Sequence, residues 1–490
     1  MSSLRAIILL LSSFALSSAV NLTCPDYYVY ATEPHGPYSG GAYNLSYQRP
    51  DTRCRTYNLT IVEDTVNRVS GDISDPDLKR LFINTYPNTL DTAIKWKGHA
   101  EGSDEELTFI ITGDINAMWL RDSSNQMQSY LPLLEASSSS RSLASLYRGV
   151  INLQARYLLF DPYCNSFQPP VESGIKPAEN EAASEDTVTP EYNNKTVFEC
   201  KYELDSLAAF LEVSDNYYTA THDIDFFSKY SWVEAVTSLM DVAEGQMIPT
   251  YQPTGNVSEI PYTFTRLTDR STETMANDGL GNPVNGGTGL IRSFFRPSDD
   301  STIYQFLIPS NMMFSRYLAP CAEIMSKIAG QEALAERMSN LASSLRDSIE
   351  TYAIAQTMQY GAIYPFEIDG YMGQNIMDDA NIPSLLSAPF FGYLDIDDER
   401  YQSTRSLILS ADNPYYMRGP VISAIGGPHV GPGYAWPMAC IVRILTSNDD
   451  AEITEQLQQI VSSTDGLGLI HESVNTFNVS DWTRQWLVMV

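Results

Sequence analysis

YQFLIPSNMMFSRYLAPCAEIMSKI at residues 304–328 and QEALAERMSNLASSLRDSIETYAIA at residues 331–355 are two successive helical patterns of this 490-residue chain. In both, apolar residues recur at intervals of three and four, the spacing that places them on one face of a helix. Glycine and proline separate such segments along the chain, as they do between helices. The same spacing recurs at residues 76–82 and beyond, 116–134, 143–160, 202–212, 226–247, 379–386, 399–409, 434–445 and 451–463. About a dozen helices are therefore predicted.

Strand patterns are few and short, at residues 57–62, 108–112 and 361–364. No repeat of fixed period stands out, and no segment resembles a linker between independent modules. The polar stretch 176–194 reads as a solvated loop, which could instead line a substrate entrance. We therefore expect an all-α fold with few short strands, in which residues 71–490 form one domain after an N-terminal segment, residues 20–70.

The net charge of −30 disfavours nucleic acid and anionic membranes as partners, because like charges would have to be brought together. A neutral or cationic substrate is more compatible with this charge. None of the motifs typical of zinc proteases, serine hydrolases, phosphate loops or aspartic proteases is present. The five histidines are scattered, which does not indicate a zinc site.

The first 19 residues have the features of a secretory signal peptide: Arg5, an apolar run from residue 6, and small residues at 17–19. This run is too short for a confident membrane span. We expect a protein that is secreted or held in the lumen of the secretory pathway. Glycosylation sequons agree with that route and begin at Asn21, Asn44, Asn58, Asn194, Asn256 and Asn478.

Six cysteines, an even number, are compatible with disulfides in an oxidising compartment. By sequence proximity alone, we expect Cys24 to pair with Cys54 and Cys164 with Cys200. The other two cysteines, Cys321 and Cys440, lie in apolar helical stretches. They could pair with each other or remain buried thiols.

The motif RSFFRPSDD at residues 292–300 places two carboxyl groups beside phenylalanines and arginines. Partial burial, or the charge of Asp300, could keep Asp299 protonated at neutral pH. In that state Asp299 could act as a general acid and protonate a departing glycosidic oxygen. The structural alternative is that this motif caps a helix beginning near Ser301.

A second acidic motif, His471-Glu472-Ser473, follows the glycine-rich turn at residues 465–468. Glycine lets the backbone approach a ligand closely, so Glu472 could serve as the base that activates water. Its alternative role is a surface glutamate on a loop. Carboxyl groups set among aromatic, arginine and glycine residues are what a glycosidase requires.

Further candidates for binding a sugar lie in three other segments. Residues 113–123 open a helix and present Trp119, Arg121 and Asp122, which suit sugar hydroxyls and the apolar face of a ring, or form an N-cap and a salt bridge. Acids alternate at Glu203 and Asp205. The rigid loop 426–436 carries His429, although a lone histidine is more often structural.

These motifs together resemble glycoside hydrolase family 125, the exo-acting α-1,6-mannosidases. The resemblance extends from about residue 93 to residue 486 and rests on MWLRDS at 118–123, YELDS at 202–206, FRPSDD at 295–300, LIPSNM at 307–312, GYL at 392–394 and HES at 471–473. It implies an (α/α)6 barrel with a pocket at one end, cleavage with inversion, and no metal. It assigns the general acid to Asp299, with Asp300 as the less favoured neighbour, and the general base to Glu472.

Inversion requires room for a water molecule, so the two carboxyl groups of an inverting enzyme stand roughly 6.5 to 9.5 Å apart. At its end the sequence departs from the family. Where relatives continue into a closing helix rich in Trp, Ala and Leu, this sequence stops at Val490. We expect either that the last helix is missing through truncation or that another segment closes the barrel.

The resulting hypothesis is a metal-independent inverting exo-α-1,6-mannosidase, without a cofactor, that releases terminal mannose from mannan or N-glycans. The alternatives are another inverting exo-glycosidase on the same barrel and a catalytically silent glycan-binding protein. Cleavage of mannobioses compared with isomaltose separates the first alternative, and mannan binding without release of mannose identifies the second. The residues expected to bind substrate are Trp119, Arg121, Asp122, Glu203, Asp205, Arg296, Asp300, His429 and His471.

Overall fold

The computed structural model describes residues 23–484, so the predicted signal peptide, the sequon at Asn21 and the last residues of the resemblance lie outside the described part. The described residues form 13 α-helices. Their bounds are α1 Tyr27–Tyr30, α2 Thr60–Asp72, α3 Pro76–Thr85, α4 Leu120–Gln128, α5 Leu143–Phe160, α6 Leu204–Thr221, α7 Ile224–Phe227, α8 Trp232–Gly245, α9 Ile308–Ser326, α10 Glu332–Tyr352, α11 Glu399–Ile408, α12 Pro437–Leu445 and α13 Asp450–Ser462.

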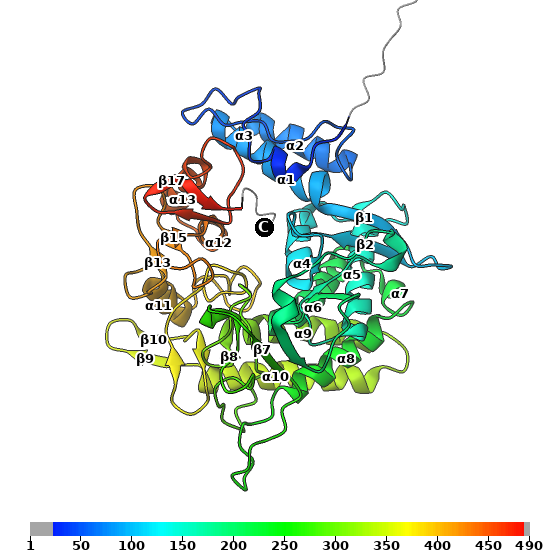
Figure 1. Cartoon of the computed structure of the whole chain (residues 1–490), viewed down its shortest axis with the longest axis vertical. Helices are drawn as coiled ribbons and strands as arrows, with labels where there is room; N and C mark the ends of the chain where they lie inside the picture. The colour runs from blue at the N-terminus through cyan, green and yellow to red at the C-terminus, as the bar shows by residue number, and fades with distance from the viewer. Residues whose placement is uncertain (1–22, 485–490) are drawn as a thin grey trace, which may run out of the picture.

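The chain runs once around a central region (Figure 1), from blue through cyan, green and yellow to red, which returns beside the blue segment. The two ends of this path are in contact, because α13 packs against α3. The amide of Asn84, on α3, donates hydrogen bonds to the carbonyl oxygens of Gly468 at 2.8 Å and Ser46 at 2.9 Å. Gly468 has φ +70°, and a Cβ there would lie 2.9 Å from the Asn84 amide nitrogen. Glycine is therefore required where the two ends meet.

Helix patterning explains the positions of the longest helices. On α10, the buried residues Ala335, Met338, Leu341, Leu345 and Ile349 repeat every three or four positions, so one face packs against α9 and the other meets solvent. In contrast, α9 lies between α6 and α10 and is buried around most of its circumference. The predicted pair of long helices is confirmed.

Two local predictions are wrong. Residues 57–62 do not form a strand, because α2 begins at Thr60; Val62, Val66 and Ser70 repeat every four positions on its buried face. Residues 379–386 do not form a helix. There, the buried carboxylate of Asp378 accepts hydrogen bonds from the backbone N–H groups of Leu385 and Leu386, which favours turns over a helix.

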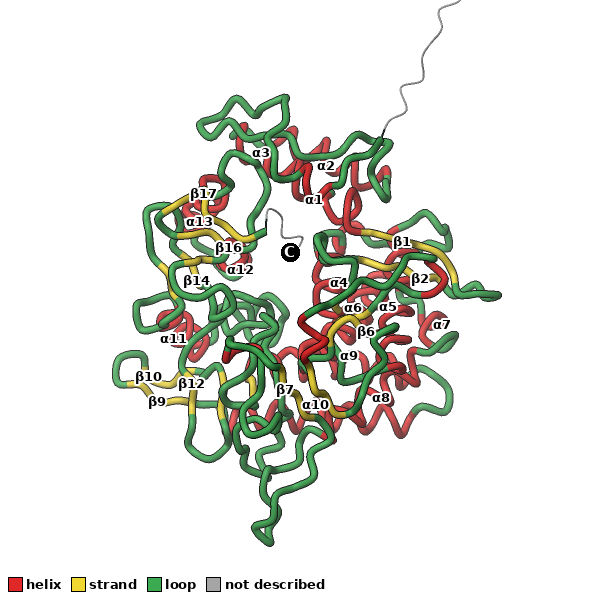
Figure 2. The backbone as a smooth tube through the Cα atoms, in the orientation of Figure 1, coloured by secondary structure: helices red, strands yellow, loops and turns green. Residues whose placement is uncertain are grey.

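Strands are more numerous than predicted, and they appear in Figure 2 as short yellow segments. The described residues contain 17 strands, and their pairs are antiparallel. A strand of only two residues cannot be recognised from alternation of apolar and polar residues, because that pattern needs at least four residues to be visible. Their bounds are β1 Ile94–His99, β2 Glu106–Ile110, β3 Met118–Trp119, β4 Ser166–Phe167, β5 Asp186–Thr189, β6 Val197–Glu199, β7 Thr263–Arg266, β8 Phe306–Leu307, β9 Ala355–Thr357, β10 Gly361–Ile363, β11 Glu367–Ile368, β12 Gln374–Asn375, β13 Tyr416–Met417, β14 Ala424–Ile425, β15 Tyr434–Ala435, β16 Ser473–Asn475 and β17 Asn478–Thr483.

Both predicted disulfides are confirmed: Cys24 is bonded to Cys54, and Cys164 to Cys200. The remaining two cysteines are buried free thiols, which resolves the open alternative. The asparagines of the five described sequons, Asn44, Asn58, Asn194, Asn256 and Asn478, are all exposed, as a glycosylation acceptor must be. Among the described helices, none has the length and apolar character needed to cross a membrane.

A buried ion pair ties the N-terminal segment to the rest of the molecule. Arg49 Nε lies 2.7 Å from Asp91 Oδ2, and both side chains are nearly inaccessible. Replacing Arg49 with alanine should lower the free energy of unfolding by about 3 kcal/mol, because Asp91 would lose its nearest cation while buried. The matched control is Arg53→Ala, which removes an exposed pair with Asp51 and should cost less than about 1 kcal/mol in urea denaturation. Equal losses in the two variants would contradict this prediction.

Candidate active site

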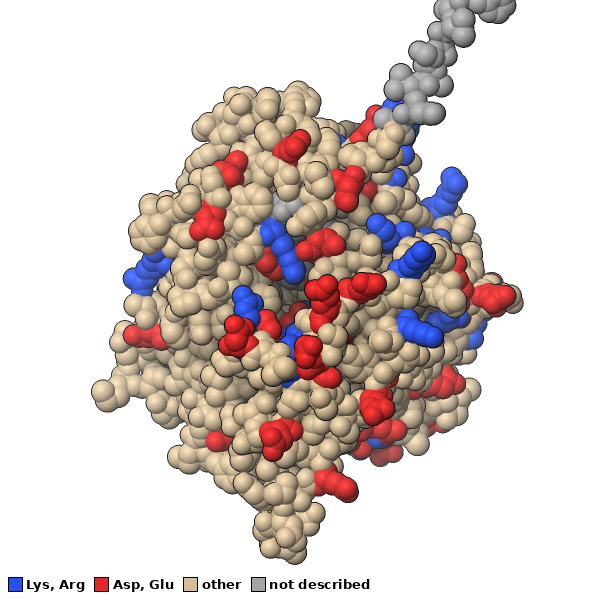
Figure 3. Space-filling model, viewed as in Figure 1, with Lys and Arg blue, Asp and Glu red and all other residues tan. Residues whose placement is uncertain are grey.

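A cavity of about 250 Å³ collects residues from segments far apart in the sequence. Acidic and basic side chains gather around a hollow in the middle of the face shown in Figure 3. The two proposed catalytic residues, Asp299 and Glu472, both line this cavity, so they do not open onto separate surfaces. The lining residues are Thr112, Asp114, Ile115, Trp119, Arg121, Asp122, Gln126, Asn180, Phe198, Glu199, Lys201, Pro297, Ser298, Asp299, Asn381, His429, Trp436, Glu472 and Arg484.

Asp299 lies on a loop, in the left-handed region of backbone conformation at φ +65°. Strained backbone of this kind concentrates at functional sites. Its carboxylate accepts a hydrogen bond from Asn165 Nδ2 at 3.2 Å, and its backbone carbonyl accepts one from Lys201 Nζ at 2.9 Å. The helix-capping alternative is wrong, because the next helix, α9, begins at Ile308 rather than near Ser301.

The surroundings of Asp299 do not favour the predicted rise of its pKa. Burial alone would raise the pKa of Asp299, but a hydrogen bond from Glu203 and nearby positive charges lower it below its usual range. Burial raises the pKa of Glu203 well above its usual range, so the pKa values of the two neighbouring carboxyl groups shift in opposite directions. Asn165 Nδ2 bridges the pair, since it also donates to Glu203 Oε1 at 3.1 Å. The positive charges belong to Lys201, Arg121 and His429.

Arg121 organises the acidic side of the cavity. It lies in the first turn of α4, directly after β3, as the sequence predicts. Its Nη1 donates to Glu203 Oε2 at 2.6 Å and to Asp205 Oδ2 at 3.1 Å, and its Nη2 lies 3.2 Å from Asp122 Oδ2. Glu203 and Asp205 are thus inaccessible and support Arg121 rather than line the cavity. Burial raises the pKa of Asp122, which lines the cavity.

Glu472 immediately precedes β16 and is 6 % exposed. Its Oε2 accepts a hydrogen bond from Thr483 Oγ1 at 2.9 Å, and its Oε1 lies 3.3 Å from Arg484 Nη1. Arg484 also reaches Asp114 Oδ2 at 3.2 Å. These donors hold the Glu472 carboxylate at the cavity wall, and its burial argues against the alternative of a surface glutamate.

His429 lines the cavity and its Nδ1 lies 3.5 Å from Asp300 Oδ2. Burial opposes protonation of His429, but the carboxylates of Asp300, Glu472 and Asp299 outweigh it and raise the pKa of the imidazole. Asp300 itself is buried and accepts a hydrogen bond from Ser298 Oγ at 2.8 Å. It orients His429 rather than lining the cavity.

Two further candidate binding residues, Arg296 and His471, lie outside the cavity lining, as Glu203, Asp205 and Asp300 do. Arg296 is buried and pairs with Glu367 at 2.7 Å, in a contact that fixes the loop preceding Asp299. His471 stacks on Trp482 with ring centroids 4.2 Å apart, and burial lowers its pKa to about 4. Trp119 does line the cavity, and its indole N–H has no hydrogen-bond acceptor among the described residues.

The chain matches the family model of metal-independent α-mannosidases, GH125, over residues 75–490. It belongs to glycoside hydrolase family 125. A relative, the meiotically up-regulated gene 157 protein of Schizosaccharomyces pombe, is 43% identical over 487 residues, which cover 98% of this chain and 94% of that protein. A similar solved structure is a metal-independent α-mannosidase of Streptococcus pneumoniae in a non-productive complex with α-1,6-mannobiose. It is 33% identical with a TM-score of 0.77, and the match covers 88% of this chain and 96% of that one.

For this member of family 125, sequence reasoning missed several charged residues at the cavity. Lys201 is the most informative of them, because it lines the cavity and its ammonium donates a hydrogen bond to the backbone carbonyl of Asp299. A signal for it was present: Lys201 immediately precedes the YELDS motif at residues 202–206. Arg484 and Asp114 gave no comparable signal, since their pairing joins segments 370 residues apart.

Proposed function

We propose that this protein is an inverting exo-α-1,6-mannosidase that releases terminal mannose from mannan or N-glycans. The observation that carries the proposal is the convergence of Asp299 and Glu472 on one cavity in a chain of the metal-independent α-mannosidase family. The α-1,6-mannobiose in the pneumococcal relative supports the choice of linkage. The cavity of about 250 Å³ is smaller than the roughly 300 to 1,000 Å³ of pockets for drug-sized ligands, which suits a single sugar.

In this mechanism Asp299 donates a proton to the glycosidic oxygen while the bond from that oxygen to the anomeric carbon breaks. Glu472 accepts a proton from a water molecule, whose oxygen forms the new bond to the anomeric carbon from the opposite face. The α linkage therefore yields β-mannose first. Thr483 and Arg484 keep the Glu472 carboxylate oriented for this step.

The terminal mannose is held by groups that line the cavity. The Trp119 indole N–H is buried without a described acceptor, so a sugar hydroxyl would satisfy it. Arg121 and Asp122 supply charge-assisted hydrogen bonds, which suit the hydroxyl groups of a neutral sugar. His429, whose pKa the surrounding carboxylates raise, adds a hydrogen-bond donor to the cavity.

The acid–base cycle also uses Glu203. The opposite pKa shifts of the two carboxyl groups favour Glu203 as the holder of a shared proton, which passes to Asp299 when the glycosidic oxygen arrives. The pair keeps this proton up to a higher pH than an isolated Asp299 would. Glu203 is thus a positioning residue that stores the proton of the general acid.

Replacing Glu203 with glutamine should lower kcat/KM at pH 7 by about tenfold and shift the alkaline limb of its pH profile to lower pH. Glutamine cannot carry the proton, and the nearby cations would keep the pKa of Asp299 low. The pH profile on α-1,6-mannobiose measures this effect. If Glu203 only braced Arg121, kcat/KM would fall without movement of the limb, and the proton-storage role would be rejected.

We also propose that the helices form an (α/α)6 barrel and that the protein is secreted or lumenal. Contact between α3 and α13 supports a closed arrangement of helix pairs. The two disulfides and five exposed sequons support passage through an oxidising secretory compartment. Mass spectrometry of glycopeptides from the secreted protein tests the route.

The decisive experiment for activity is incubation with α-1,6-mannobiose, followed by NMR of the mannose released in the first seconds to minutes. Appearance of the β anomer before mutarotation supports both the activity and the inversion. Initial release of the α anomer would reject inversion while retaining the activity. Absence of turnover, with α-1,2- and α-1,3-mannobiose and isomaltose also uncleaved, would reject the glycosidase assignment.

A further inference from the structure

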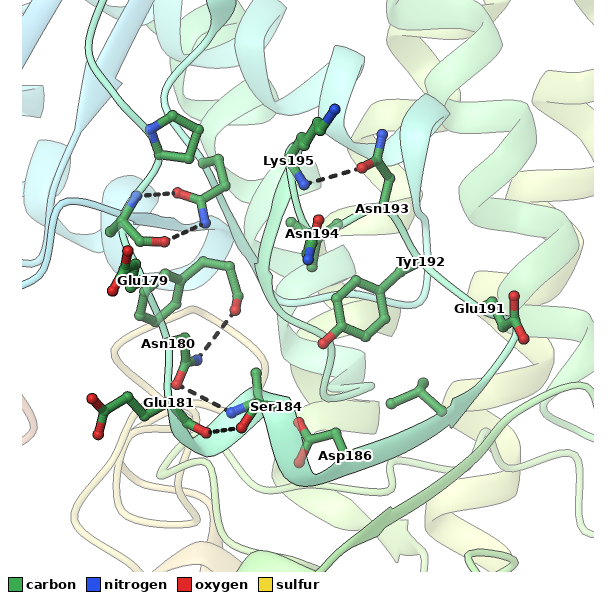
Figure 4. A pocket seen from close by; sticks show the side chains of 17 residues that line it. Glu179, Asn180, Glu181, Ser184, Asp186, Glu191, Tyr192, Asn193, Asn194 and Lys195 are labelled. Atoms are coloured by element: carbon green, nitrogen blue, oxygen red, sulfur yellow. Dashed lines mark hydrogen bonds between the residues drawn. The ribbon is translucent and has the colours of Figure 1, made fainter.

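A second, larger hollow of about 810 Å³ lies beside the candidate active site. It is bounded mainly by residues between 177 and 198, most of which belong to the predicted solvated loop 176–194 (Figure 4). Asn180 and Phe198 line both hollows, so the two spaces share a common wall. The proposed exo-mannosidase mechanism leaves this larger space unused.

The segment is anchored firmly enough to form a binding surface. The disulfide between Cys164 and Cys200 closes its base, and β6 pairs with β4 immediately inside that bond. Asn180 Nδ2 donates to the Phe198 carbonyl at 3.2 Å, which fastens the outer part of the segment to β6. Arg266, on β7, pairs with Asp186 on the neighbouring strand β5 at 2.6 Å.

This hollow is built on the segments that hold Asp299. A general acid stands next to the glycosidic oxygen, so the departing sugar begins beside it. Asp299 is held by Asn165 and Lys201, the two residues that directly flank the Cys164–Cys200 disulfide. Glu472, the proposed base, is held instead by Thr483 and Arg484.

The lining has the chemistry of a carbohydrate site. Figure 4 shows Asn180 and Glu181 on one side of the hollow and Tyr192 and Asn193 on the other. The half-buried Tyr192 ring offers an apolar face to the C–H groups of a sugar. Burial and the nearby carboxylates of Asp186 and Glu199 raise the pKa of Tyr192 to about 12, so its hydroxyl remains a donor.

We propose that this hollow binds the third and later sugar units of the substrate, counted from the terminal mannose that is released. The preferred substrates are then neutral α-mannosides of three or more units. The proposal rests on the proposed function and specifies its substrate class. Four carboxylates and a single lysine line the hollow, which disfavours mannans that carry phosphate. The carboxylates and amides accept and donate hydrogen bonds to neutral hydroxyl groups.

The test compares kcat/KM for α-1,6-linked mannobiose, mannotriose and mannotetraose. Wild-type protein should cleave mannotriose with about tenfold higher kcat/KM than mannobiose, a factor within reach of one aromatic contact. Tyr192→Ala should lose this gain and keep the mannobiose value, whereas Tyr192→Phe should keep most of it. The matched control is Tyr371→Ala, which removes a tyrosine that is 46 % exposed and lines neither hollow.

Calorimetry of binding to an Asp299→Asn background makes the same comparison without turnover, and there mannotriose should bind about tenfold more tightly than mannobiose. Cleavage of mannobiose without any gain for longer substrates would overturn the proposal and leave the proposed function intact. The proposal would also be overturned if Tyr192→Ala kept the higher kcat/KM for mannotriose over mannobiose. An equal increase in kcat/KM for mannotriose phosphorylated on its reducing-end sugar would overturn it as well. If no mannoside is cleaved, and mannobiose and mannotriose bind with equal affinity, the proposed function and this inference fail together.

Discussion

Asp299→Asn is expected to lower kcat on α-1,6-mannobiose by about 10²- to 10⁴-fold, the range that a positioned general acid contributes. Asparagine is nearly isosteric and tolerates the left-handed backbone at φ +65°, so the loop should keep its shape. The amide cannot transfer a proton to the glycosidic oxygen. The mannose oxygen of the leaving group must then depart as an alkoxide, which is the costly step.

The identity of the leaving group turns this prediction into a test of role. A 2,4-dinitrophenyl α-mannoside departs as a stable phenolate and needs no proton, so Asp299→Asn should lose less than about tenfold on that substrate. The matched control is Asp278→Asn, because Asp278 is exposed and also has a left-handed backbone, at φ +53°. It should behave as wild type on both substrates. Equal losses of Asp299→Asn on both substrates would remove Asp299 from the acid role.

The helical architecture was accessible from sequence because long amphipathic segments carry a strong periodic signal. The bounds of α5 are reproduced to the residue, and those of α10, α11 and α13 to within three residues. The failures occur where tertiary contacts override local pattern. Residues 379–386 have helical spacing, yet the carboxylate of Asp378 captures backbone N–H groups that a helix would use.

The site was partly accessible for a similar reason. Motifs identify chemistry-bearing residues, but the direction of each side chain depends on backbone geometry. His471 and Glu472 are adjacent in sequence, yet Glu472 lines the cavity while His471 stacks on Trp482. Arg296 was misplaced because its partner, Glu367, lies 71 residues away and leaves no trace in local pattern.

Protonation states were the least accessible feature. Burial and the adjacent Asp300 suggest a protonated Asp299, and burial does act in that direction. The opposing cations come from three separate segments, at Arg121, Lys201 and His429, and the hydrogen-bonding partner Glu203 comes from one of the same segments. The net pKa shift of Asp299 is the sum of several opposed contributions, and small changes of distance can reverse its sign. Its direction can therefore be assigned only from coordinates.

Glu472→Gln is expected to lower kcat by about 10²- to 10⁴-fold on α-1,6-mannobiose. Glutamine keeps an acceptor for the Thr483 hydroxyl, so β16 and β17 should remain paired and substrate binding should change little. It is too weak a base to take a proton from the attacking water. Stopped turnover with mannobiose still bound, measured by calorimetry, is therefore the expected signature.

The contrast with Asp299 decides the role of Glu472. Activation of water is needed whatever group departs, so Glu472→Gln should lose about the same factor on the dinitrophenyl mannoside as on mannobiose. The matched control is Glu212→Gln. Glu212 is a buried glutamate that lies outside the cavity and accepts a hydrogen bond from Tyr317, so this variant should retain wild-type kcat. Recovery of Glu472→Gln on the activated substrate would mean that Glu472 assists departure instead, and the two carboxyl roles would have to be exchanged.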